Sequence, residues 1–170
     1  MQWYREDVEE LPPEQCWELL GATGIGRLAV VVDDWPEIFP VNYAVDDTAD
    51  DATVVFRSGE GTKSAGAAAR APVSLEVDGL DPSGGRAWSV VLKGRAAPVP
   101  RGHELMRALE LPLFPWQAGV KDRFVRIVPV EVTGRRFPVA DPGSWNSSAA
   151  AGRRTPTGSA RWTSAGPDRE

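Results

Sequence analysis

Residues 25–45 read IGRLAVVVDDWPEIFPVNYAV, in which two runs rich in valine and isoleucine flank an acidic turn that contains proline. Such runs, bounded by polar turns, indicate the strands Ile25–Val32 and Ile38–Val45, joined across Asp33-Asp34-Trp35-Pro36 and followed by a turn at Asp46-Asp47. Four further runs of the same kind predict strands at Thr53–Arg57, Val73–Leu80, Ala87–Val99 and Arg123–Phe137. Six strands of this length favour a small, mainly β (α+β) fold in which an antiparallel sheet closes on itself.

Two or three short helices are expected among these strands. Proline at residues 12 and 13, followed by Glu14–Leu20, is typical of a helix start with an acidic first turn. Helices are also predicted at Thr62–Arg70 and at Gly102–Leu111, where Leu105, Met106 and Leu109 recur at helical spacing.

The chain has 170 residues, of which 42% are apolar, so it can bury one core of ordinary domain size. Its composition changes at residue 141, after which glycine, alanine, serine, threonine and proline dominate. Such a segment buries too little apolar surface to offset its ordering entropy. We therefore expect a domain over residues 1–140 and a flexible tail over residues 141–170.

The net charge and the low numbers of cysteine and histidine limit the classes of function that we expect. The net charge of −5 argues against nucleic-acid binding, and no apolar run approaches the length of a membrane span. The first residues do not resemble a signal peptide, so we expect a cytoplasmic protein. One cysteine, Cys16, and one histidine, His103, argue against a disulfide framework and against a Cys/His metal site. Any demanding chemistry is therefore expected to come from an organic cofactor that acts on a small-molecule substrate.

The segment from Phe56 to Ser64 reads FRSGEGTKS and combines the end of a strand, two glycines and the start of a predicted helix. Backbone N–H groups at a helix start, the hydroxyls of Ser58 and Thr62, and the cations Arg57 and Lys63 are suited to a phosphate. The alternative is a glycine-rich connection with a solvated lysine.

Two further segments could meet a planar ring. Pro40 interrupts a strand, which leaves backbone groups near Val41 and Asn42 free to bind a polar ring edge; the alternative is a twisted edge strand. Trp88 and Ser89 open a long strand, although Trp88 would equally suit a core or an interface. Because parts of this strand are apolar on both faces, a homodimer would cover the second face.

Taken in order, several motifs resemble the pyridoxamine 5′-phosphate oxidase-like family of FMN-binding split β-barrels, in particular its small actinobacterial and nitroimidazole-resistance-type branch. The motifs are GRLA at 26–29, PVNY at 40–43, FRSGEGTK at 56–63, EVD at 76–78, WSVVLKGRA at 88–96, PW at 115–116 and VRIVP at 125–129. The resemblance covers roughly residues 10–137 and implies a homodimer with two FMN sites at the subunit interface.

The resemblance also implies which residues bind FMN. The phosphate contacts would be Arg57, Ser58, Thr62 and Lys63. Val41 and Asn42 would meet the isoalloxazine ring, Trp88 and Ser89 would lie near its pyrimidine side, and Trp116 would come from the partner chain. Arg123 and Arg126 are secondary candidates.

The implied function is that of an FMN-dependent oxidoreductase that moves a hydride or electrons between a reduced nicotinamide, or a small organic substrate, and an acceptor. The alternatives are a reductase dependent on 8-hydroxy-5-deazaflavin and a flavin- or haem-binding module without turnover. The C-terminal segment lacks the histidine of true pyridoxamine phosphate oxidases, which argues against that specific reaction, and no catalytic side chain is assigned.

Overall fold

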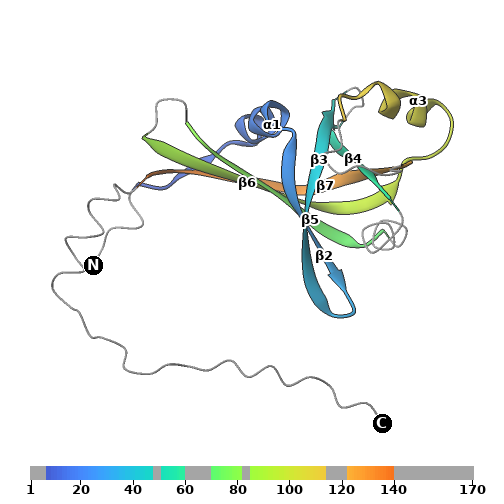
Figure 1. The fold of residues 1–170 in the computed structure, drawn as a ribbon. Coiled ribbons are helices and arrows are strands. Elements are labelled where there is room, and N and C mark those ends of the chain that lie inside the picture. The colour runs from blue at the N-terminus through green and yellow to red at the C-terminus, as the bar shows by residue number, and fades with distance from the viewer. Residues whose placement is uncertain (1–6, 48–50, 60–69, 82–84, 114–121, 140–170) are drawn as a thin grey trace, which may run out of the picture. The chain divides into compact units, whose positions relative to one another are not determined.

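The computed structural model describes residues 7–47, 51–59, 70–81, 85–113 and 122–139. Figure 1 shows an antiparallel sheet with a helix over each of two separate parts of it. In chain order the elements are β1 (Glu9–Leu11), α1 (Pro13–Ala22), β2 (Ile25–Val32), β3 (Trp35–Asp46), β4 (Thr53–Ser58), β5 (Pro72–Leu80), β6 (Arg86–Pro98), α3 (His103–Glu110) and β7 (Arg123–Pro138).

The sheet closes through its two longest strands. Its order is β1-β7-β4-β3-β2-β5-β6, and β6 also pairs with β7, so strands β2 to β7 form a closed six-stranded barrel. All of these pairings are antiparallel, which confirms the predicted fold class. The short strand β1 is a seventh strand, added along β7 at Gly134 to Arg136. Three residues carry too little periodicity to be recognised in a sequence.

The first hairpin is tighter than the sequence suggested. Val32 pairs directly with Trp35, so only Asp33 and Asp34 form the turn, and both have positive φ angles, 49° and 64°. Positive φ angles at both central residues are typical of a type I′ turn, whose twist matches that of the two strands it joins. Aspartate tolerates positive φ angles better than β-branched residues do. Trp35 and Pro36, which were expected in the turn, therefore begin β3.

Two groups of buried side chains hold the domain together. The larger fills the barrel and includes Cys16 and Leu20 of α1, which packs into the barrel interior. The smaller lies outside the barrel, where Ala108 of α3 packs against Ala44, Val55 and Phe124. Each helix therefore packs on a different side of the same sheet wall.

Both predicted helices that fall in the described residues are confirmed, with α1 extending from 13 to 22 and α3 from 103 to 110. The predicted helix at 62–70 lies almost entirely outside the described residues. The tail at 141–170 lies outside them as well, so the domain boundary stays a prediction. Neither of the helices described has the length and apolar character needed to cross a membrane.

Tyr43 ties the end of α1 to the barrel. Its hydroxyl donates to the carbonyl of Leu20 at 2.8 Å and lies 2.6 Å from the hydroxyl of Thr23, while its side chain is buried. Burial raises the pKa of Tyr43, and the hydrogen bond with Thr23 lowers it less. The folded chain therefore keeps this phenol neutral at pH values where the unfolded chain ionises it.

We expect Tyr43→Phe to lower the free energy of unfolding by about 1 kcal/mol near pH 7, because the Leu20 carbonyl loses the shorter of its two side-chain hydrogen bonds and keeps only that from the Thr23 hydroxyl at 3.4 Å. The raised pKa gives the wild type stability that is fully present below about pH 10 and is lost above it, so the loss should be shallower in the variant. Urea unfolding at pH 7 and pH 10.5 measures both effects. Equal alkaline losses in the two proteins would contradict this account.

Candidate cofactor site

The first group of predicted cofactor residues lies where β3 pairs with β4. Tyr43 and Phe56 are Cα partners and both point into the barrel. Because side chains alternate along a strand, Asn42 and Arg57, which flank this pair, lie together on the outer face. Val41 points inward and is buried, so it offers only its backbone to an outer ligand.

Arg57 and Ser58 end β4 on opposite faces. The guanidinium of Arg57 lies over the ring of Phe124, 5.2 Å from its centroid, which orients the cation on the outer face. Ser58 is buried, and its hydroxyl donates to the carbonyl of Gly59 at 3.1 Å. The proposed phosphate role of Ser58 would require that hydroxyl to turn away from its present acceptor. Thr62 and Lys63 lie outside the described residues, as does Trp116.

The second group lies on β6. Trp88 is 7% exposed and belongs to the barrel core, where its indole covers Gly79: a Cβ at Gly79 would come within 2.6 Å of the Trp88 ring. This placement gives Trp88 a packing role, and its contact with a cofactor stays a prediction. Ser89 points outward and is half-buried, between its Cα partners Asp78 and Arg135.

The barrel places these two groups on strands that are not neighbours. Around the closed sheet β3 is separated from β6 by β2 and β5 on one side and by β4 and β7 on the other. Asn42 and Ser89 of one chain therefore lie on strands with two others between them by either path. The sequence, which places them on separate strands, could not reveal this separation.

Arg126, a secondary candidate for flavin binding, forms ion pairs with other side chains of the protein. It pairs with Asp46 at 3.0 Å and with Glu104 of α3, and Arg107 of α3 also reaches Asp46 at 3.3 Å. The Asp46 side chain is only 3% exposed, so the predicted solvated turn at Asp46-Asp47 is wrong for its first residue. This cluster of ion pairs anchors α3 to the sheet. The position of Arg126 is therefore better explained by a role in holding α3 than by a role in cofactor binding. Arg123 is exposed at the start of β7, as the Cα partner of Ser58.

A closed antiparallel barrel of six strands with two short helices, one of which adds Cys16 and Leu20 to the barrel core, is the architecture of the split β-barrel class. The chain belongs to the pyridoxamine 5′-phosphate oxidase-like family, whose model matches residues 12–136. This confirms the resemblance seen in the sequence.

Individual relatives agree with this assignment. The solved structure of an FAD-binding protein from Mycobacterium smegmatis is 37% identical, with a TM-score of 0.63 over 76% of this chain and 99% of that one. An FAD-binding protein from Mesorhizobium loti is 29% identical, with a TM-score of 0.61 over 76% of this chain and 97% of that one. An uncharacterized protein of Mycobacterium tuberculosis is 39% identical over 50% of this chain and 76% of its own length. The mycobacterial relatives agree with the expected actinobacterial branch.

Proposed function

We propose that this protein binds FMN and acts as a flavin-dependent oxidoreductase. The proposal rests on one observation. On the outer wall of β3 and β4, the Asn42 amide and the Arg57 guanidinium lie on one face next to the glycine-containing segment. Support also comes from the flavin described for the two solved relatives.

The residues present fit the chemistry of a flavin. A guanidinium is a strong donor to phosphate, and a carboxamide offers both the donor and the acceptor that a flavin's pyrimidine edge requires. Arg57 is held in place by the ring of Phe124, so little side-chain freedom is lost when it meets an anion. Lys63 and Thr62 are proposed to complete the phosphate contacts.

The mechanism assigned to the chain is binding and orientation. When bound, a flavin supplies the acceptor and donor of a hydride, so the protein needs no nucleophile of its own. Asn42 would fix the ring edge, Arg57 would hold the phosphate end, and the backbone at Val41 would lie against the ring.

We further propose a homodimer in which each flavin site takes Asn42 and Arg57 from one chain and Ser89 from its partner. The two groups lie on strands that are not neighbours in one barrel, and a second copy would bring them together at one site. Exposed apolar side chains lie beside each group: Ile25, the Cα partner of Asn42, is 38% exposed, and Leu80, two residues beyond Asp78, is 67% exposed. Packing these against a second copy would remove apolar surface from water.

Absorption spectra of the purified protein, before and after adding FMN, test the cofactor. We expect a flavin spectrum and, for Lys63→Ala, an affinity for FMN lower by about tenfold or more, since a charge-assisted contact is lost. Chromatography of the released cofactor distinguishes FMN from FAD and from 8-hydroxy-5-deazaflavin. A wild-type protein that neither carries nor takes up any flavin would refute the proposal, and a haem spectrum would favour the non-catalytic alternative.

Mixing two variant chains tests the shared site. Asn42→Leu and Ser89→Leu are each expected to weaken FMN binding in their own homodimers. After the two are unfolded together and refolded, about a quarter of the sites should regain wild-type affinity, because half of the dimers are mixed and each mixed dimer holds one intact site. Refolding each variant alone is the control. No recovery in the mixture would place both residues in a site made by one chain, or outside the site.

A further inference from the structure

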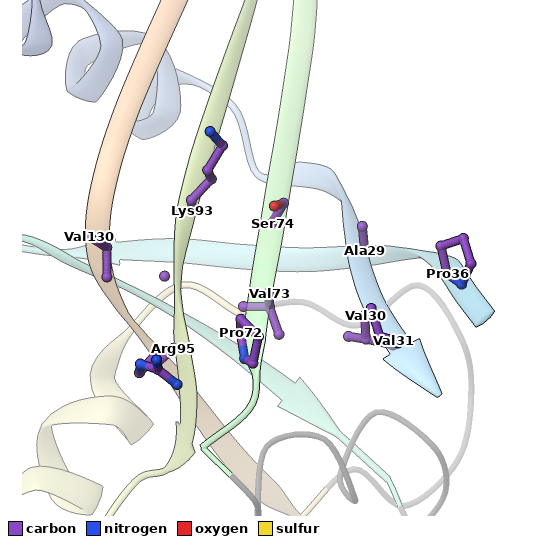
Figure 2. Close-up of a pocket in the computed structure, with 11 residues that line it drawn as sticks. Ala29, Val30, Val31, Pro36, Pro72, Val73, Ser74, Lys93, Arg95 and Val130 are labelled. Carbon is purple, nitrogen blue, oxygen red and sulfur yellow. The ribbon is translucent and has the colours of Figure 1, made fainter. Parts of the chain in front are cut away.

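A groove of about 410 Å³ crosses the outer face of the barrel near the β2–β3 turn (Figure 2). Strands β2, β3, β5, β6 and β7 all contribute to its walls. Most of the surface is apolar, and the side chains concerned are Ala29, Val31, Pro36, Pro72 and Val130. No residue assigned above to flavin binding lines this groove, so it is a separate feature of the fold.

The groove lies beside an irregularity in the sheet. Gly94 pairs with Pro129 and Lys93 pairs with Glu131, so Val130 is an extra residue without a partner on β6. Val130 lies on the outer face, where it is 76% exposed, and Val31, which also lines the groove, is 60% exposed. Two exposed valines on the walls of one groove suit an apolar ligand.

Two cationic side chains, Lys93 and Arg95, line the groove on the same face of β6, and they have different partners. The Lys93 ammonium is paired with Glu131 at 2.7 Å. Arg95 donates from Nη1 to the carbonyl of Arg70 at 3.2 Å, and in the described part of the chain no carboxylate pairs with it. A guanidinium carries five N–H donors, so Arg95 retains donors for an anion. Figure 2 also shows Ser74 on the adjacent strand, where it adds a hydroxyl to the wall.

We propose that this groove is a second binding site, for a small organic monocarboxylate with an apolar chain. The carboxylate would accept hydrogen bonds from Arg95, and the chain would lie between Val31 and Val130. Charge complementarity selects an anion, and the apolar walls select its chain over a small inorganic ion. The volume falls within the range of pockets that hold small molecules.

Calorimetric titration of the flavin-loaded protein with octanoate, and with its neutral analogue octanamide, tests this site. We expect one octanoate per chain, and an affinity about tenfold lower for Arg95→Gln, because a hydrogen bond to a charged group is lost. Octanamide should bind more weakly than octanoate to the wild type and should be affected less than twofold by the same change. Arg101→Gln, an exposed arginine outside the groove, is the matched control. Val130→Asp should weaken both ligands.

Four results would overturn the proposal: no octanoate binding, equal binding to the wild type and Arg95→Gln, an equal loss in Arg101→Gln, or octanamide losing as much affinity as octanoate. A second copy of the chain that filled the groove would give the first of these results. The flavin absorbance reports the proposed cofactor separately. A colourless protein that still binds octanoate through Arg95 would refute the flavin proposal alone.

Discussion

Replacing Gly94 by valine is expected to lower the free energy of unfolding by about 3 kcal/mol or more, because barrel closure leaves no room for a side chain there. A Cβ at this position would lie 2.4 Å from the carbonyl oxygen of Val128 and 2.7 Å from Cγ2 of Ile127. The first of these atoms belongs to the backbone of β7, so relief requires separating the two strands that close the barrel. Urea unfolding measures the loss.

Gly21→Ala is the matched control for this experiment. Gly21 lies in the last turn of α1, and a Cβ there would have no atom within 4 Å. Alanine should therefore leave stability unchanged or raise it by up to about 1 kcal/mol through helix propensity. A loss below about 1 kcal/mol for Gly94→Val would show that β6 and β7 can separate at the bulge at little cost.

The second large effect is expected for Asp46→Asn, which we predict to lower the free energy of unfolding by about 2–4 kcal/mol. The Asp46 side chain is 3% exposed and faces two guanidinium groups, those of Arg107 and Arg126, at 3.3 and 3.0 Å. An amide keeps the shape of the carboxylate but removes its charge, which leaves Arg107 facing a neutral group and Arg126 with only the exposed Glu104 as its carboxylate partner. Because both arginines hold α3 to the sheet, α3 should also become the first site of limited proteolysis.

Asp78→Asn is the matched control for Asp46→Asn, because it removes an ion pair that is exposed to solvent. Asp78 pairs with Arg27 on the outer face of β5, where its side chain is 54% exposed, so solvent screens the interaction. The expected change is about 0.5 kcal/mol or less. If Asp46→Asn were no more costly than Asp78→Asn, the buried cluster would not be what anchors α3.

The proposed flavin site and the groove lie in different regions of the same barrel. Asn42 and Ser89 use the outer walls of β3 and β6 near the start of β2, whereas Arg95 and Val130 lie near the end of β2, at the bulge. A substitution in one region is therefore expected to leave ligand binding at the other within about twofold, as separated sites without shared partners usually behave.

The strands and the class of fold could be predicted from the sequence alone. Ile25–Val32 was predicted with the bounds the structure has, and the other five predicted strands differ by no more than three residues at an end. This succeeded because strand periodicity and turn residues are local properties of the chain. The order of the motifs also indicated the family, and the resemblance assigned Asn42 and Arg57 to one cofactor.

How these parts combine depends on contacts that only the folded chain makes. Pairing of β6 with β7 closes the barrel, and the strand order puts two strands between Asn42 and Ser89, although both look equally available in the sequence. The same packing buries Asp46 beneath α3, and it leaves Val130 unpaired at a bulge. Burial, strand order and register depend on contacts between residues far apart in the chain, which no local pattern records.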